Sequence, residues 1–114
     1  MRLIFKILAS DEWREAQAAG AFEGSPVDRS DGYIHFSTAA QTPETAGKWF
    51  AGRDDLTLVA VDADALGSAL VWEPSRGGER FPHLYGALPL GAVVWSRPLT
   101  RGPDGAHVLG SLEA

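Results

Sequence analysis

Apolar and polar positions alternate, or apolar residues follow one another, in several short stretches of the chain. Residues 2–8 alternate and place Leu3, Phe5 and Ile7 on one face of an expected strand. Residues 56–61 are almost all apolar, which is typical of a strand covered on both faces. Further strands are predicted at residues 33–37, 69–72, 81–85 and 92–95. The pattern therefore predicts a sheet of about five or six strands.

Two main helices are predicted between these strands. The first begins with Ser10 as a suitable N-cap and runs to about Ala19, where a glycine follows. The second begins at Thr42, with a proline at the first helical position, and ends near Gly52. Residues 21–31 contain glycine and proline turn signals and are predicted to form a loop.

The order of these elements predicts an α+β fold, because strands outnumber helices and no repeated βαβ unit is visible. A length of 114 residues favours one compact domain over residues 1–114. In this fold a sheet, mixed or mostly antiparallel, would pack against the two helices.

Composition narrows the functional classes. The absence of cysteine excludes disulfides, thiolate catalysis and zinc–thiolate sites. The net charge of −5 without a basic stripe argues against general binding of nucleic acid. The apolar run of residues 3–9 is short and interrupted by Lys6, so we expect no signal peptide, no membrane partner and a cytoplasmic location.

Residues 33–38 carry the first candidate for chemistry. Alternation along a strand would put Ile34 and Phe36 in the core and Tyr33, His35 and Ser37 together on the other face. Three hydrogen-bonding side chains in one row suit a ligand cleft. An ordinary amphipathic strand with its polar face in water remains the alternative.

The second candidate combines Glu73, at the end of a predicted strand, with the segment Arg80–Gly86. His83 and Tyr85 would share a face of an extended chain, and a carboxylate, an imidazole and a phenol can perform acid–base work or orient a ligand. The alternative is that Glu73 is a solvated strand end and that Tyr85 packs its ring with the hydroxyl outside.

Other motifs are weaker. Ser75 with Gly77 and Gly78 could form a phosphate nest, but the segment has no dinucleotide or Walker fingerprint. No local spacing supports a metal site around His35 and His83, so we expect no metal and no certain cofactor. A nucleophile elbow around serine is also absent from the sequence.

The segments Asp31–Gln41, Leu70–Glu73, Phe81–Gly86 and Leu88–Leu90, together with the pair Trp49–Phe50, resemble domain-of-unknown-function family 952, a group of small bacterial proteins. The likeness covers the chain from the first strand to about Val94. That family looks like a compact relative of the ADP-ribosyltransferase fold, in which a split sheet opens into a cleft for NAD.

The resemblance implies positions for the candidate residues around such a cleft. Tyr33, His35, Ser37 and Thr38 would lie along the nicotinamide side. Glu73, or the pair His83 and Tyr85, would lie near the reacting ribose, and Arg80 or Lys6 would supply a cation.

Two functions follow from these considerations. The first is an ADP-ribosyltransferase-like protein that binds NAD, as a substrate, or another ribose-phosphate ligand. Its catalytic residues would be His35, Glu73 and His83, and its ligand-binding residues Lys6, Tyr33, Ser37, Thr38, Arg80 and Tyr85. The second is a non-catalytic module that binds a small molecule or a protein partner in the same cleft.

Overall fold

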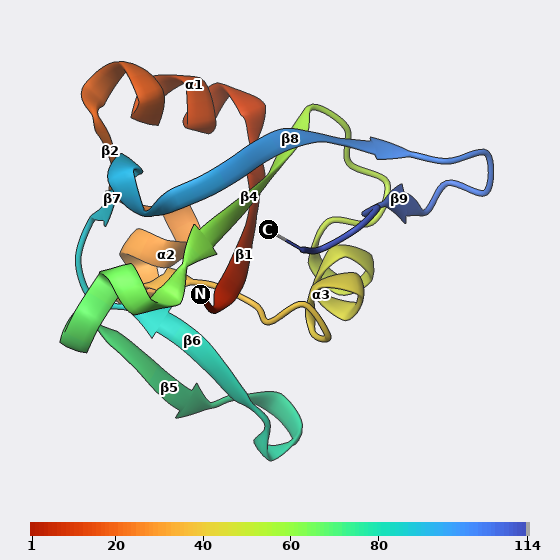
Figure 1. Ribbon diagram of the computed structural model, residues 1–114. Coiled ribbons are helices and arrows are strands. Elements are labelled where there is room, and N and C mark those ends of the chain that lie inside the picture. Colours follow the sequence, from red (N-terminus) through yellow and green to blue (C-terminus); the bar gives the residue numbers. More distant parts are fainter. Residues whose placement is uncertain (114) are drawn as a thin grey trace.

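The computed structural model describes residues 1–113, and its strands form antiparallel sheets (Figure 1). The largest sheet has four strands, in the spatial order β1 (Leu3–Ala9), β4 (Leu56–Asp62), β8 (Val93–Arg101) and β9 (His107–Val108). A three-stranded sheet has the order β3 (Ile34–His35), β6 (Arg80–Leu84) and β5 (Leu70–Pro74). Strands β2 (Ala21–Phe22) and β7 (Leu88–Pro89) form a short pair. Every strand pair among the described residues is antiparallel, so the alternative of a mixed sheet is not realised.

One residue pair joins the four-stranded sheet to the three-stranded one. Ser37 donates its amide N–H to the carbonyl of Phe5 at 2.9 Å and accepts from the amide of Phe5 at 2.8 Å. One residue earlier, Phe36 donates to the carbonyl of Pro82 on β6 at 3.0 Å. After β3 the chain therefore changes its hydrogen-bonding partner from β6 to β1. The two sheets together curl into a half-barrel (Figure 1).

Three helices accompany these sheets: α1 (Ser10–Ala19), α2 (Pro26–Asp31) and α3 (Thr42–Trp49). Short 3₁₀ turns cover Ala63–Ala69, Arg76–Gly78 and Leu90–Ala92. The prediction that residues 21–31 form a loop is wrong, because α2 lies within this segment. The predicted number of two main helices is therefore one too few. Its start follows Ser25, with proline at the first helical position, and its end is capped by the left-handed Gly32.

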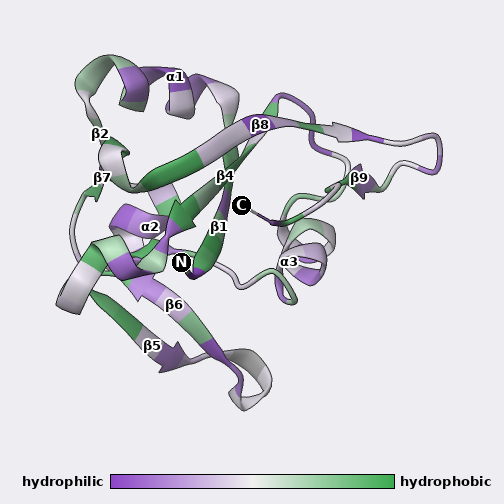
Figure 2. Cartoon of the chain, in the orientation of Figure 1, coloured by the Kyte–Doolittle hydropathy of each residue, from purple (hydrophilic) through white to green (hydrophobic). Residues whose placement is uncertain are grey.

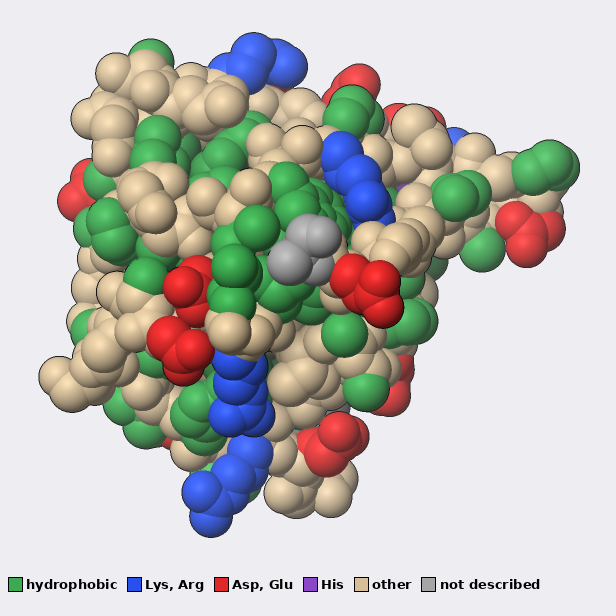
Figure 3. Space-filling model, viewed as in Figure 1, with side chains coloured by type: hydrophobic (Ala, Val, Ile, Leu, Met, Phe, Trp, Pro, Cys, Tyr) green, Lys and Arg blue, Asp and Glu red, His purple; other side chains and the backbone are tan. Residues whose placement is uncertain are grey.

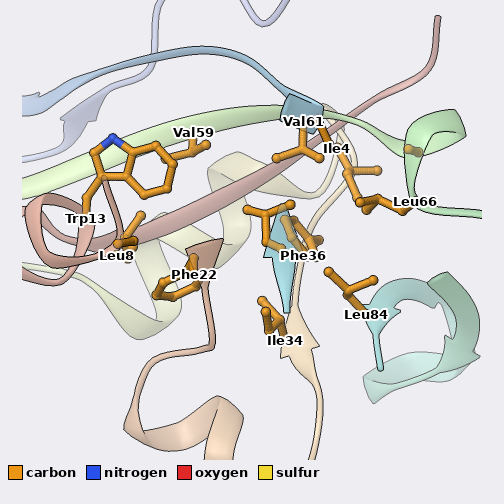
Figure 4. Packing of buried hydrophobic residues seen from close by; sticks show 14 residues of the cluster. Ile4, Leu8, Trp13, Phe22, Ile34, Phe36, Val59, Val61, Leu66 and Leu84 are labelled. Atoms are coloured by element: carbon orange, nitrogen blue, oxygen red, sulfur yellow. The ribbon is translucent and has the colours of Figure 1, made fainter. Parts of the chain in front are cut away.

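Two layers of apolar side chains lie on the two faces of β4, which explains its nearly unbroken apolar sequence. Val59 and Val61 pack into a first core, whereas Leu58 and Ala60 pack into a second one. Figure 4 shows the first core between β1, β4, α1 and the three-stranded sheet. Figure 2 shows the same strand coloured as hydrophobic over most of its length. The prediction of a strand covered on both faces is confirmed.

A lysine interrupts the side of β1 that faces the first core. Ile4 and Leu8 are buried there, and Lys6 lies between them with only 7% of its surface exposed. A buried ammonium group is costly unless a charge partner is supplied. The partner is Asp28 of α2, which lies 2.9 Å from the ammonium nitrogen.

Several predicted boundaries differ from the structure. The strand predicted at residues 33–37 is regular only over Ile34–His35, and the strand predicted at 92–95 continues as β8 to Arg101. Ser10 begins α1 rather than capping it, and its hydroxyl is 2.8 Å from that of Thr57. Among the residues described, no helix is long and apolar enough to cross a membrane.

Candidate functional site

The outer side of the three-stranded sheet carries a group of aromatic and ionisable side chains. His83 of β6 is opposite His35 of β3 and opposite Val71 of β5, and directly opposed residues project to the same side of a sheet. Tyr33 and Glu73 project to that side as well, because both contact His83, and Tyr85 joins them through its contacts with Tyr33 and Glu73. We call the set Tyr33, His35, Glu73, His83 and Tyr85 the aromatic face.

The opposite side of this sheet is the core. Ile34 and Leu84 are each 2% exposed or less and point towards Phe36 and Leu66 in Figure 4. The predicted alternation of Ile34 and Phe36 with Tyr33 and His35 is therefore confirmed. The sheet holds the aromatic face on a backbone that is anchored from behind by packed side chains.

The rings of the aromatic face contact one another. Tyr33 stacks on His83 with centroids 4.1 Å apart and an angle of 26° between the planes. Tyr33 also contacts His35 at 4.7 Å and Tyr85 at 5.3 Å. Consequently His83 is 5% exposed, whereas the outermost ring, Tyr85, is 46% exposed and open to a ligand.

Glu73 links two of these rings through one carboxylate oxygen. Its Oε1 lies 2.7 Å from Nδ1 of His83 and accepts the phenol hydrogen bond of Tyr85 at 2.8 Å. The hydrogen bond with His83, followed by that with Tyr85, lowers the pKa of Glu73 below its ordinary value. Donation to Glu73 raises the pKa of Tyr85. Glu73 is therefore an ionised carboxylate at neutral pH.

His35 lies between two aspartates. Its Nδ1 is 2.6 Å from Oδ1 of Asp28, and its Nε2 is 2.9 Å from Oδ2 of Asp31. Carboxylates accept hydrogen bonds, so the ring makes both contacts as hydrogen bonds when both of its nitrogens carry protons. Asp31 is exposed, and Asp28 is fully buried, so His35 connects the surface with the interior.

Asp28 is the buried support of this site. Its carboxylate also accepts the amide N–H of His35 at 3.1 Å, that of Ser25 at 2.8 Å and the ammonium group of Lys6. Burial alone would raise the pKa of Asp28, but the bonds to His35 and the charge of Lys6 lower it to about 2. For Lys6 burial dominates and lowers its pKa, although the charge of Asp28 opposes this effect.

Sequence reasoning missed Asp28 because it lies in the segment predicted as a loop. The signal was present: serine, proline and aspartate at positions 25, 26 and 28 form the start of a helix in which the third helical residue returns to the N-cap amide. Recognition of that pattern would have predicted α2. The pairing with Lys6 and His35 depends on tertiary structure.

Ser37 and Thr38 lie away from the aromatic face. Ser37 is 6% exposed, and its hydroxyl oxygen lies 2.9 Å from the hydroxyl oxygen of Thr45 on α3. Thr38 and Gln41 bond to each other in the turn before α3: the Thr38 hydroxyl accepts a hydrogen bond from the Gln41 amide at 3.2 Å, and the Thr38 amide donates to the Gln41 side chain at 3.0 Å. Both residues hold the start of α3.

The two predicted cations also lie elsewhere. Lys6 is committed to Asp28 in the interior. Arg80 is opposite Pro74 at the far end of β6, and alternation groups it with Pro82 and Leu84, on the other side from His83. The structure thus brings together Tyr33, His35, Glu73, His83 and Tyr85, while their role in ligand binding stays a prediction.

No group of three or more His, Asp and Glu side chains within residues 1–113 is arranged to hold a metal ion. A surface hollow of about 570 Å³ lies beside the β8–β9 hairpin and is lined by Asp54, Asp55, Leu99–Pro103 and Gly105. It contains none of the predicted site residues. In the view of Figure 3, Lys and Arg side chains occur in separate groups among acidic and apolar ones.

The chain matches one protein-family model and the solved structures of a related protein. The family model described as "Protein of unknown function (DUF952)" matches residues 7–96. The chain is 52% identical to protein CC0527 from Caulobacter crescentus, whose crystal structure it matches with a TM-score of 0.91 over 95% of both chains. The solution NMR structure of CC0527 matches with a TM-score of 0.86 at 52% identity, over 96% of this chain and 95% of that one. Among curated proteins no significant match is found.

Proposed function

Because this chain belongs to the DUF952 family, whose description assigns no activity, we propose its function from the site itself: the aromatic face binds NAD or a related ribose-phosphate ligand and loosens its glycosidic bond. The proposal includes the relationship to the ADP-ribosyltransferase fold that the sequence motifs suggest. Its support is chemical and comes from the side chains on the outer side of the three-stranded sheet.

The observation that carries the proposal is the position of the Glu73 carboxylate. Oε1 is held by His83 and Tyr85, whereas Oε2 has no hydrogen-bond partner among the described residues. The side chain is 34% exposed, so Oε2 is open to a ligand. An oriented carboxylate at the edge of an aromatic surface suits a reaction in which positive charge develops.

Cleavage of NAD at the nicotinamide ribose is such a reaction. The nicotinamide ring is a planar cation, and the exposed ring of Tyr85 offers it a π face next to the negative charge of Glu73. As the bond to nicotinamide lengthens, positive charge moves onto the ribose, and Glu73 would stabilise that charge.

Calorimetric titration with NAD, ADP-ribose and nicotinamide tests the binding. We expect NAD to bind more tightly than ADP-ribose, since only NAD carries the cationic ring. Release of nicotinamide, measured by chromatography, tests the reaction, and Glu73→Gln should abolish it. Glu15→Gln on the exposed surface of α1 is the matched control. Equal affinity for NAD and ADP-ribose would argue against recognition of the ring.

One observation favours the second candidate, a binding module without catalysis. Neither Lys6 nor Arg80 reaches the aromatic face, so a diphosphate would find no cation from the residues that the sequence nominated. A cationic small molecule without phosphate would then be the ligand. Binding without nicotinamide release, unchanged by Glu73→Gln, would support this candidate over the enzyme.

A further inference from the structure

We infer that His83 is the general base of the site: its Nε2 atom, oriented by Glu73, takes a proton from a hydroxyl nucleophile that attacks the ligand. This inference rests on the proposed function for its substrate and on the geometry of His83 for its chemistry. It also specifies the class of reaction, which the position of Glu73 alone does not: transfer of the ADP-ribosyl group to water or to an alcohol.

The first step of the argument is the orientation of the ring. Nδ1 of His83 is 2.7 Å from the ionised carboxylate of Glu73, which accepts a hydrogen bond from Nδ1–H. A neutral imidazole that carries its proton on Nδ1 has its basic lone pair on Nε2. Stacking against Tyr33 at 4.1 Å holds the plane of the ring. The tautomer and the direction of the lone pair are thus fixed before a ligand arrives.

The second step is the accessibility of Nε2. This atom makes no hydrogen bond to any described residue. Within the described part of the chain, no buried side-chain nitrogen or oxygen lacks a partner, so the unpartnered Nε2 reaches the surface, although the His83 side chain as a whole is only 7% exposed. A basic nitrogen that is oriented from one side and unpartnered on the other has the arrangement required of a general base.

The third step distinguishes the two histidines. His35 has a carboxylate at each nitrogen, so it presents no free lone pair. His83 has a carboxylate at one nitrogen only. The rings are 5.5 Å apart and meet edge to face, so a ligand near one is near the other. Both nitrogens of His35 are therefore engaged by aspartates, and His83 is the histidine of the aromatic face that can accept a proton.

With NAD as substrate the step balances as follows. Nε2 of His83 removes a proton from water while the water oxygen bonds to C1′ of the nicotinamide ribose. The bond between C1′ and the nicotinamide nitrogen breaks, and its electron pair neutralises the ring. The products are ADP-ribose, nicotinamide and one proton, which His83 releases to solvent. An alcohol acceptor in place of water would give an O-glycoside of ADP-ribose by the same transfer, with the same loss of nicotinamide and one proton.

A ligand-free experiment tests the base directly. The ring ¹⁵N signals of the three histidines are recorded by NMR from pH 5 to 9 and assigned with His83→Asn and His107→Asn. We expect His83 to show, on the alkaline side, a protonated Nδ1 and an unprotonated Nε2. A proton that stays on Nε2 over the whole range from pH 5 to 9 would overturn the inference. That result would leave the proposed binding of NAD unaffected. The titratable groups facing His83 are Glu73 on β5, His35 on β3, and the phenols of Tyr33 and Tyr85.

Nicotinamide release provides the second test. In His83→Asn the amide can still donate to Glu73, but the base is lost, so the rate should fall about 10²–10⁴-fold while calorimetric affinity for NAD is kept. The acid limb of the pH–rate profile should disappear, and added imidazole should partly restore the rate of His83→Ala. His107→Asn, at the distant β8–β9 hairpin, should behave as the wild type.

The outcomes separate the two proposals. NAD that binds and is cleaved equally fast by His83→Asn overturns the general base and leaves the proposed function standing. NAD that binds but is never cleaved by the wild type also overturns the base and favours the binding module. No binding of NAD overturns the proposed function, and the tautomer of His83 then decides the inference by itself.

Discussion

Asp28 fixes His35 through two contacts: its Oδ1 lies 2.6 Å from the Nδ1 atom of His35 and 3.1 Å from the amide nitrogen of the same residue. Helix α2 therefore holds both the backbone and the ring of a residue on the aromatic face. The same carboxylate balances the buried ammonium group of Lys6. Stability of the fold and geometry of the candidate site depend on one side chain.

The first prediction concerns that side chain. Asp28→Asn leaves Lys6 buried beside a neutral amide, and removal of one partner of a buried ion pair costs about 3–5 kcal/mol. The midpoint of urea unfolding should fall accordingly. Asp31→Asn, which removes an exposed aspartate from the other nitrogen of His35, should cost about 1 kcal/mol or less. Equal losses in the two variants would show that the ion pair contributes little.

The second prediction concerns acid. The pKa of Asp28 is lowered from 3.8 to about 2 in the folded protein. A carboxyl group whose pKa is depressed by folding contributes stability at pH values above its unfolded pKa. That contribution, about 2 kcal/mol, should be lost as the pH falls from about 5 to 2. The pKa of Glu73 is lowered as well, so its effect has the same sign, reduced by its exposure to solvent.

Urea unfolding at several pH values measures this dependence. The slope of stability against pH below pH 5 should be smaller in Asp28→Asn than in the wild type, because the variant lacks the group that titrates. A variant slope as steep as that of the wild type would assign the acid sensitivity to other carboxylates.

The third prediction concerns the turn before α2. Gly24 has a φ of +107°, and a Cβ atom built there would lie 2.9 Å from Cβ of Asp28. Gly24→Ala should therefore cost about 1–3 kcal/mol from backbone strain, with the clash in addition. Gly20→Ala is the control: its φ is +89° and nothing lies within 4 Å, so strain alone should cost about 1 kcal/mol. Thermal unfolding of both variants separates the cost of backbone strain from the cost of the clash with Asp28.

The fourth prediction separates the ring of Tyr85 from its hydroxyl. Tyr85→Phe keeps the exposed ring and loses the bond to Glu73, so the affinity for NAD should be almost unchanged. Tyr85→Leu removes the π face, and a cation–π contact of about 0.5–2 kcal/mol corresponds to a rise in Kd of about 2- to 30-fold. Calorimetry measures both. A larger loss in the phenylalanine variant would assign binding to the hydroxyl.

Much of the fold was accessible from the sequence because its signals are local. The unbroken apolar run of β4, the glycine that ends α1, and the alternation of Ile34 with His35 each depend on neighbouring residues. The prediction of an α+β fold is confirmed. The error at α2 came from turn residues that outweighed a helix of six residues with few buried positions.

The candidate site was accessible in part for the same reason. Strand periodicity predicted the shared face of Tyr33 with His35 and of His83 with Tyr85, and the register between β3 and β6 brought the pairs together. Periodicity could not show that Ser37 leaves that sheet to pair with Phe5, or that Thr38 bonds to Gln41 in the turn before α3. Those contacts depend on which distant segment each polar atom meets.

The bridge between Phe5 and Ser37 is a narrow connection between the two sheets. A single residue pair connects the hydrogen-bond ladder of the four-stranded sheet with that of the sheet carrying the aromatic face. This connection depends on two backbone hydrogen bonds, fewer than the number that joins β1 to β4 or β4 to β8 within the four-stranded sheet. The amides of Phe5 and Ser37 donate these two hydrogen bonds, so the exchange of their protons with deuterium measures how often the connection between the two sheets opens.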